Sequence, residues 1–232
     1  MRQVVLDTET TGLEVGKGHR IIEIGCIELI ERRASGRRFH RYLNPQRMVD
    51  EGARAVHGIS DEFLADKPRF AEVATEFLQF VEGAELVIHN AAFDIAFLDA
   101  ELALADPGLG RMTDHASVLD TLALAREKYP GQRISLDALC KRLNIDNRHR
   151  ELHGAMLDAQ LLADVYLAMS GGQGDLGLIN APLAAATAHV GQRPVSDSPL
   201  RVRRANALEQ AAHETRLQAI DKASKGHCLW RA

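Results

Sequence analysis

The sequence is short of several residue types and patterns, and each shortage narrows the class of protein. Only three of the 232 residues are cysteines, and they are far apart in the sequence. They therefore predict neither a disulfide framework nor a zinc site. No apolar run approaches the roughly 20 residues needed to cross a bilayer. The first carboxylate already stands at Asp7, which is too early for a signal peptide. We therefore expect a cytoplasmic protein without a membrane partner.

The sequence also lacks an excess of positive charge. The chain has 28 Lys and Arg against 32 Asp and Glu, a formal net charge of −4, which argues against a large basic surface for nucleic acid. The distribution is uneven, because residues 195–232 hold seven Lys/Arg against four Asp/Glu, a net +3, which leaves −7 on residues 1–194. An acidic body fits a site made of carboxylates, which would meet phosphate through metal ions instead of lysines.

The apolar pattern predicts one α/β domain. With 46% hydrophobic and 26% charged side chains, the composition is ordinary for a soluble globular protein, and the chain is long enough to form a domain with a sizeable core. Strands are predicted over residues 4–6, 21–29, 38–43 and 86–88. Helical spacing is found over residues 70–81, 93–104, 118–128, 136–143 and 155–169. Strands first, then helices and strands mixed, predict a mixed sheet.

The C-terminal quarter has a different composition. Residues 173–199 are rich in Gly, Ala, Pro and Ser, so we expect a flexible linker there. Residues 200–222 show a short amphipathic pattern, and the single tryptophan, Trp230, stands near the end. The sequence therefore divides into a domain, a linker and a tail, over residues 1–172, 173–199 and 200–232.

Asp7 and Glu9 form the first candidate site. They stand two residues apart at the end of a strand, so their side chains project from the same face of the sheet. Converging carboxylates repel each other unless a cation lies between them, and a few hard oxygen ligands suit Mg²⁺ or Mn²⁺ better than zinc. The alternative, one acid capping the turn and one solvated, is favoured roughly three to one for an isolated Asp-x-Glu.

Three further residues can join this pair. Asp94 opens a helix, where an acid also has the ordinary role of stabilising the helix start. His153 can accept a proton near neutral pH, as activation of a water requires. Asp158 follows five residues later, about 140° around a helix, so His153 must stand ahead of that helix to share its site. Otherwise His153 is a surface histidine beside a helical acid.

Together these residues resemble one family. Their order and spacing match the three motifs of the h-type DEDD exonucleases, which here read Asp7-x-Glu9, Asn90-x-x-Phe93-Asp94 and His153-x-Ala155-x-x-Asp158. Flanking segments narrow the likeness to the epsilon subunits of bacterial DNA polymerase III, the replicative proofreaders, and these segments are residues 5–13, 56–59 and 228–232. The likeness is close over residues 1–172, looser in the linker, and returns in the tail.

This resemblance implies a fold and a chemistry. The fold is ribonuclease-H-like, a mixed β-sheet flanked by helices, followed by the flexible linker and tail. The activity is a proofreading 3′–5′ exonuclease with two divalent ions, Mg²⁺ or Mn²⁺, and the residues that would hold them are Asp7, Glu9, Asp94 and Asp158. By the same likeness His153 is the general base, and hydrolysis of the 3′-terminal phosphodiester releases a nucleoside 5′-monophosphate.

The resemblance also assigns substrate contacts. Glu9 would contact the terminal 3′-hydroxyl, and His57 and Asp158 the same nucleotide. Family members often have a glutamate five residues before that histidine, whereas this chain has Gly52 there, so we expect the adjacent Glu51 to take its place. The substrate is a single-stranded or frayed 3′ end of DNA, and selectivity can arise from the cost of unpairing, because mismatched ends fray more readily.

The C-terminal segments imply protein partners. Residues 173–178 resemble the peptides that dock on sliding clamps, through Gln173, Leu176 and Leu178, although a glycine-rich linker with two chance leucines is the alternative. The tail over 200–232 resembles the segment that binds the polymerase catalytic (alpha) subunit, and such tethering raises the local concentration of the nuclease. A small stabilising, theta-like subunit is a further expected partner.

Two other functions stay open from the residues alone. One is a freestanding relative that trims RNA, but such relatives lack this linker and tail. The other is a catalytically silent adaptor between polymerase and clamp, and the five intact catalytic-type residues argue against it. Other polar residues have structural interpretations: His89 as a packed or hydrogen-bonded histidine, and Ser60, Asp120 and Ser135 at helix starts.

Overall fold

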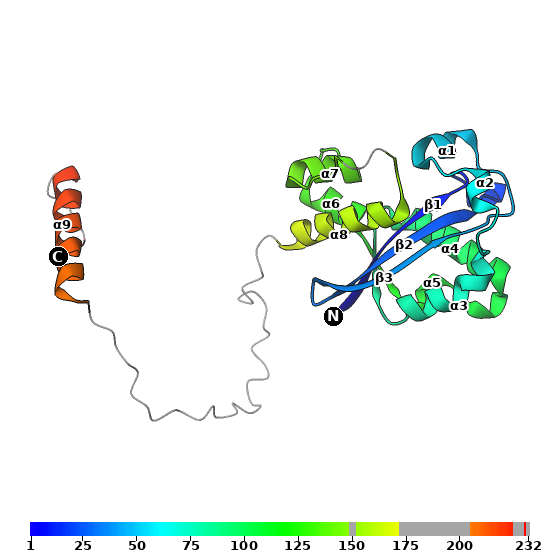
Figure 1. Ribbon diagram of the computed structural model, residues 1–232, viewed down its shortest axis with the longest axis horizontal. Helices are drawn as coiled ribbons and strands as arrows, with labels where there is room; N and C mark the ends of the chain where they lie inside the picture. The colour runs from blue at the N-terminus through cyan, green and yellow to red at the C-terminus, as the bar shows by residue number, and fades with distance from the viewer. Residues whose placement is uncertain (149–151, 172–204, 225–229, 231–232) are drawn as a thin grey trace, which may run out of the picture. The chain divides into compact units, whose positions relative to one another are not determined.

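The computed structural model describes residues 1–148, 152–171, 205–224 and 230. The chain divides into two units, Met1–Leu176 and Gly177–Ala232. The first unit has a five-stranded sheet of order β3-β2-β1-β4-β5, with helices on both faces (Figure 1). β1 pairs antiparallel with β2 and parallel with β4, which confirms an α/β domain with a mixed sheet.

Five strands form this sheet: β1 (Arg2–Thr10), β2 (Ile21–Ile30), β3 (Arg33–Tyr42), β4 (Glu85–Ile88) and β5 (Ser117–Asp120). β3 starts five residues before the predicted 38–43, because a tight hairpin at Glu31 and Arg32, both with positive φ, pairs its first half with β2. The helix predicted over 118–128 is wrong at its start. Residues 118–120 belong to β5, since they pair in parallel with 86–88 at the sheet edge.

The helices of the described residues are α1 (Glu51–His57), α2 (Asp61–Leu64), α3 (Phe70–Val81), α4 (Ala91–Ala105), α5 (Met112–His115), α6 (Thr121–Lys128), α7 (Leu136–Leu143), α8 (Ala155–Gly171) and α9 (Ala207–Ala223). Two predicted helices, α3 and α7, are confirmed with the same bounds. The apolar period does not predict α1, α2 or α5, which are too short to repeat it. The predicted helix starts are confirmed, because Ser60, Asp120 and Ser135 each accept a hydrogen bond from a backbone N–H of the following turn.

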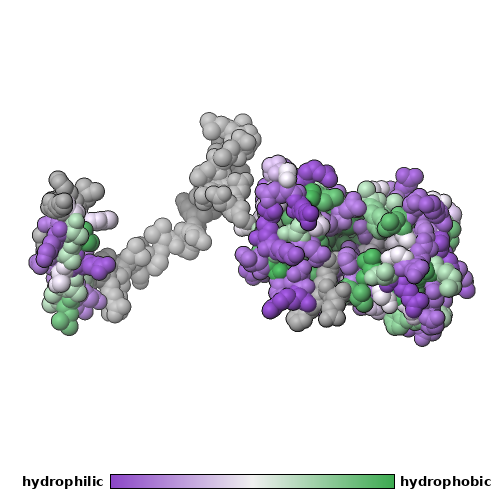
Figure 2. Space-filling model, turned by 90° about the horizontal axis from the view of Figure 1, so that it is seen from above, coloured by the Kyte–Doolittle hydropathy of each residue, from purple (hydrophilic) through white to green (hydrophobic). Residues whose placement is uncertain are grey.

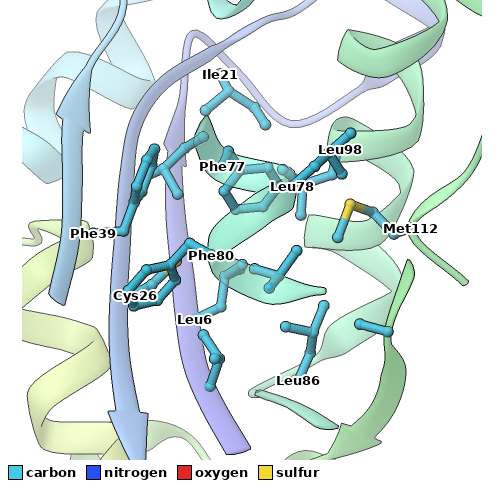
Figure 3. Close-up of a cluster of buried hydrophobic side chains, with 14 of the residues drawn as sticks. Leu6, Ile21, Cys26, Phe39, Phe77, Leu78, Phe80, Leu86, Leu98 and Met112 are labelled. Carbon is cyan, nitrogen blue, oxygen red and sulfur yellow. The ribbon is translucent and has the colours of Figure 1, made fainter. Parts of the chain in front are cut away.

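Apolar side chains fill both faces of the sheet. On one face, Leu6 of β1 belongs to a core with Phe77 of α3 and Leu98 of α4 (Figure 3). On the other face, Val5 packs with Leu162 of α8. Because successive strand residues face opposite sides, this alternation places the odd-numbered Asp7 and Glu9 on the α8 side.

A partly buried ion pair links α4 to the start of β2. Arg20 donates from Nε and Nη2 to the two carboxylate oxygens of Glu101, at 2.7 and 2.6 Å. The backbone N–H of Ile21 donates to the same carboxylate at 3.1 Å. Charge-assisted, bidentate contacts of this kind are among the strongest hydrogen bonds in proteins. They fix the helix that carries Asp94 against the sheet.

The second unit contributes one described helix. α9 begins at a capping box, in which Asn206 Oδ1 accepts from the N–H of Glu209 at 2.9 Å. α9 covers most of the amphipathic pattern predicted over 200–222 and ends at Ala223, and none of its described residues is buried. The linker over 173–199 and its motif residues Gln173, Leu176 and Leu178 lie outside the described residues.

The surface and the cysteines add two further findings. Hydrophilic and hydrophobic side chains are interspersed on the face of the first unit that Figure 2 shows. Cys26 and Cys140 are both buried. Within the described ranges, no helix has the length and apolar character that a membrane span requires.

Glu28 is a fully buried acid on β2. It accepts hydrogen bonds from Arg2 Nε and Ser35 Oγ, both at 2.7 Å, and from Arg37 Nη1 at 3.0 Å. Burial alone would raise the pKa of Glu28, but these donors outweigh it and lower the pKa below its ordinary value. Such a carboxylate stabilises the fold at pH values above its pKa in the unfolded chain. The stabilisation is lost as the pH falls through its pKa in the folded protein.

We predict that Glu28→Gln lowers the free energy of unfolding by about 1–3 kcal/mol at pH 7, because charge-assisted hydrogen bonds are lost. The gap from wild type should close as pH falls below about 4.3, the ordinary glutamate pKa. Denaturant unfolding of both proteins at neutral and acidic pH measures this gap. A gap of equal size at every pH would contradict the assignment.

Candidate functional site

A pocket of about 460 Å³ lies at the C-terminal end of β1, beside the starts of α4 and α8. All five residues predicted to carry the chemistry line it, namely Asp7, Glu9, Asp94, His153 and Asp158. The sheet explains part of this convergence. Parallel strands end at the same edge, so the pairing of β1 with β4 brings the start of the following helix, α4, beside the end of β1.

Two local features of the β1–β2 ladder shape this edge. The register shifts after Glu9, which stands opposite Glu23, and such irregularities re-aim side chains. Asp7 stands opposite Gly25, whose missing side chain lets α8 lie directly on β2. A Cβ at Gly25 would collide with the main chain of Ala155. The close approach brings the first turn of α8, with Asp158, to the acids of β1.

The turn between β4 and α4 depends on Asn90. Its backbone is left-handed, with φ 67° and ψ 52°, a conformation that asparagine tolerates better than most residues. Its N–H donates to Asp120 Oδ1 at 3.1 Å. One turn later, buried Asp94 accepts a hydrogen bond from Thr8 Oγ1 at 2.6 Å. Burial raises the pKa of Asp94 to about 7, although the hydrogen bond from Thr8 opposes the shift.

His153 lies in the loop ahead of α8, as predicted. Its backbone N–H donates to the Val56 carbonyl at 3.1 Å, and its Nδ1 lies 3.4 Å from Asp158 Oδ2. The side chain of His153 is 45% exposed and that of Asp158 only 4%, so the histidine faces solvent while the acid is enclosed. Donor atoms of Glu9, His153 and Asp158 all lie within 4.8 Å of one another.

The chemistry of this pocket fits divalent cations. Glu9, Asp94 and Asp158 are all buried, and buried like charges are costly unless a cation neutralises them. Carboxylate oxygens are the ligands that Mg²⁺ and Mn²⁺ prefer. Glu9 and Asp158 belong to the tight cluster with His153, whereas Asp7 and Asp94 line the same pocket around it.

A second pocket of about 480 Å³ adjoins the first, and Thr8, Glu9 and Phe93 line both. His57, at the end of α1, is buried in its wall. The N–H of Ile59 donates to His57 Nδ1 at 3.0 Å, so the proton of the neutral ring belongs on Nε2. This Nε2 is buried, and it has no hydrogen-bond partner among the described residues.

The surroundings of His57 favour its neutral form. Burial lowers the pKa of His57 and the charge of His153 adds to this effect, while the main chain of Thr10 opposes it. At neutral pH the ring therefore has one unused N–H donor in the wall of the second pocket. Such a donor suits an oxygen atom of a bound ligand.

Two other residues singled out in the sequence, Glu51 and His89, differ in their placement. Glu51 is exposed at the first position of α1 and lines neither pocket, whereas its neighbour Gly52 lines the second. His89 is hydrogen-bonded, as expected, with Nδ1 2.9 Å from Thr121 Oγ1, although it also lines the first pocket. Sequence reasoning missed Thr8, because strand alternation assigns it to the face opposite the two acids.

Comparison with known proteins gives one consistent result. Residues 4–166 match a family model described as exonuclease. The chain is 54% identical to the DNA polymerase III subunit epsilon of Escherichia coli over 241 residues, covering 100% of this chain and 98% of that protein. The same-named protein of Pasteurella multocida is 51% identical and covers 99% and 93%.

A solved structure agrees with the fold. Exonuclease X in complex with 5′ overhanging duplex DNA is 27% identical, with a TM-score of 0.56, over 74% of this chain and 94% of that chain. The likeness supports the expected ribonuclease-H-like arrangement, in which the mixed sheet is flanked by helices. Both pockets lie in the first unit.

We predict that Asn90→Val lowers the free energy of unfolding by about 1–2 kcal/mol, because a branched residue is strained at positive φ. It should also weaken the thermal stabilisation given by Mn²⁺, since Asp94 is displaced, whereas Asn90→Gly should keep that stabilisation. Asn144, which is left-handed at the end of α7, offers the matched control. Asn144→Val should lose similar stability and keep the Mn²⁺ response, and equal loss of that response in both valine variants would contradict the prediction.

Proposed function

The chain belongs to the DNA polymerase III epsilon family of exonucleases, and from this premise we propose that its two pockets together carry out proofreading hydrolysis at a DNA 3′ end. The observation that carries this proposal is the convergence of Glu9, His153 and Asp158 within 4.8 Å. The bond that breaks is the 3′-terminal phosphodiester. Water supplies the new oxygen on phosphorus, so the product is a nucleoside 5′-monophosphate.

Four carboxylates are proposed to hold the ions. Asp7, Glu9, Asp94 and Asp158 would bind two divalent cations, Mg²⁺ or Mn²⁺, which lower the pKa of water and neutralise charge on the phosphate. Their placement supports this role, since they line one pocket from β1, α4 and α8. Thr8 supports it further, because its hydroxyl holds the Asp94 carboxylate at 2.6 Å.

His153 is proposed as the general base. Its ring is half-exposed, so it can take a proton from the attacking water and pass it to solvent. Asp158, 3.4 Å from Nδ1, orients the ring, and the bond from the His153 N–H to Val56 fixes the loop. A histidine ahead of its helix can therefore share one site with an acid inside the first turn.

The second pocket is proposed to hold the terminal nucleotide. Glu9 lines both pockets, which suits a contact with the 3′-hydroxyl between base and phosphate. The unused Nε2 donor of His57 suits the same nucleotide, and Asp158 would contact it from the first pocket. Exposed Leu13 and Val56 at the wall can pack on unpaired bases. Glu51 would need to move to contribute.

The partners are proposed from the C-terminal segments. Relatives named as subunits of DNA polymerase III match this chain nearly end to end, which supports a polymerase alpha contact through residues 200–232. Trp230 is 80% exposed, and aromatic side chains often anchor interfaces. Residues 173–178 would contact the sliding clamp, and a theta-like subunit and a cytoplasmic location belong to the same proposal.

Neither alternative function is favoured. A freestanding RNA-trimming enzyme would not need the tail that these relatives share. A silent adaptor would not need four acids and a histidine in one pocket. Release of mononucleotides from a mismatched DNA 3′ end, with Mg²⁺ or Mn²⁺, separates the three. Preference for RNA supports the first alternative, and no release from either substrate supports the second.

We predict that His153→Ala slows this release by roughly 10²–10⁴-fold, the usual contribution of a general base. His115→Ala serves as the control, because His115 is bonded to Glu82 and to the Leu109 carbonyl, away from both pockets. Rates are compared on one mismatched primer with saturating Mn²⁺. A His153→Ala protein with the wild-type rate would show that another group is the base.

Truncation after Gly172 tests the modular division. The shortened chain should release mononucleotides from DNA as fast as the full chain, because both pockets lie within residues 1–171. It should lose binding to the polymerase alpha subunit, measured by co-elution or surface capture. Loss of both properties, or retention of polymerase binding, would refute the proposed domain, linker and tail.

A further inference from the structure

Glu23 is a buried acid that the proposed reaction does not use. It lies on β2 with 2% of its surface exposed and stands opposite Glu9 in the β1–β2 register. Its Oε1 is 2.8 Å from His40 Nε2 on β3. Its Oε2 is buried and has no hydrogen-bond partner among the described residues. Like charges on opposed strand positions destabilise a sheet, so each acid needs its own source of positive potential.

The unpaired oxygen of Glu23 lies beside the start of α8. A Cβ built on Gly154 would lie 3.9 Å from Oε2, in ordinary van der Waals contact, so this carboxylate oxygen lies close to the residue that precedes α8. The first hydrogen bond of the helix runs from the N–H of Asp158 to the Gly154 carbonyl at 2.8 Å. The N–H groups ahead of it cannot bond within the helix, which makes this end electropositive. A negative charge at this place attracts the helix start.

The carboxylate is held from the other side by β3. His40 donates to Oε1, and its ring lies 5.0 Å from that of Tyr42, which makes an edge contact with Phe63 of α2 at 4.9 Å. Burial and the neighbouring Glu23 raise the pKa of Tyr42, so its hydroxyl keeps its proton. Glu23 therefore lies between His40 and Tyr42 of β3 on one side and the start of α8 on the other.

We propose that Glu23, held by His40, is a positioning residue for the nuclease reaction. Its charge draws the first turn of α8 and the preceding loop against β2, which sets His153 and Asp158 at their distances from Glu9. The effect on catalysis rests on the proposed function, which assigns His153 as the general base. The placement of α8 by Glu23 does not depend on that function. Glu23 itself lines neither pocket and has no contact with substrate in this scheme.

Full-length Glu23→Gln tests the charge with little change of shape. We expect kcat on a single-stranded oligonucleotide to fall roughly 10–100-fold, because small misplacement of a reacting group is costly, while KM stays within about twofold. Glu28→Gln, a second buried acid on the same strand, is the matched control and should keep both constants. His40→Ala should reproduce the effect of Glu23→Gln. His40→Gln, which can still donate to Oε1, should restore most of kcat.

The thermal shift given by Mn²⁺ alone separates this inference from the proposed function. Glu23→Gln should reduce that shift relative to wild type and to Glu28→Gln, whether or not the wild type cleaves DNA. If wild type and Glu23→Gln give the same shift, or kcat is unchanged, the positioning role is overturned. A rise in KM alone, or equal kcat losses in Glu23→Gln and Glu28→Gln, overturns it too. If Glu23→Gln does not fold, kcat and the Mn²⁺ thermal shift are compared for His40→Ala and His40→Gln instead. Equal values in these two variants would overturn the positioning role.

Discussion

Mutual repulsion among carboxylates is the constraint on which the rest of this structure depends. Four of the acids that line one pocket are the candidate metal ligands Asp7, Glu9, Asp94 and Asp158, and three of these are buried, so the fold must hold together groups that would otherwise separate. Strand pairing and the packing of helices on the sheet do this. Parallel pairing of β1 and β4 sets one edge, and the missing side chain of Gly25 admits α8. Polar contacts such as Thr8 to Asp94 then fix individual carboxylates.

The same arrangement explains how an acidic protein can act on DNA. The pocket acids supply places for cations, and the adjoining pocket offers apolar walls and one neutral histidine donor, so little basic surface is required. Recognition can then depend on an unpaired end instead of a long duplex contact. The polymerase subunit that the tail is proposed to bind would make the remaining contacts with DNA. The distribution of charge and the chemistry of the two pockets are thus consistent with each other.

Much of this was accessible from the sequence, for reasons visible in particular residues. Period-two alternation places Asp7 and Glu9 on one face, and the 140° argument places His153 ahead of α8. Other features depend on long-range pairing. Residues 118–120 have helical spacing yet form β5, because β4 offers an open edge. Thr8 and Glu23 were missed since their roles arise from neighbours 86 and 17 residues away, Asp94 and His40.

The hydrogen bond from the His153 N–H to the Val56 carbonyl links two parts of the site that are far apart in the chain. Leu152 rests over Gly58, so the loop ahead of α8 and the end of α1 form one joined surface around His57. The wall of the second pocket and the loop that carries His153 are therefore joined by two direct contacts, so neither part of the backbone can move without straining the other.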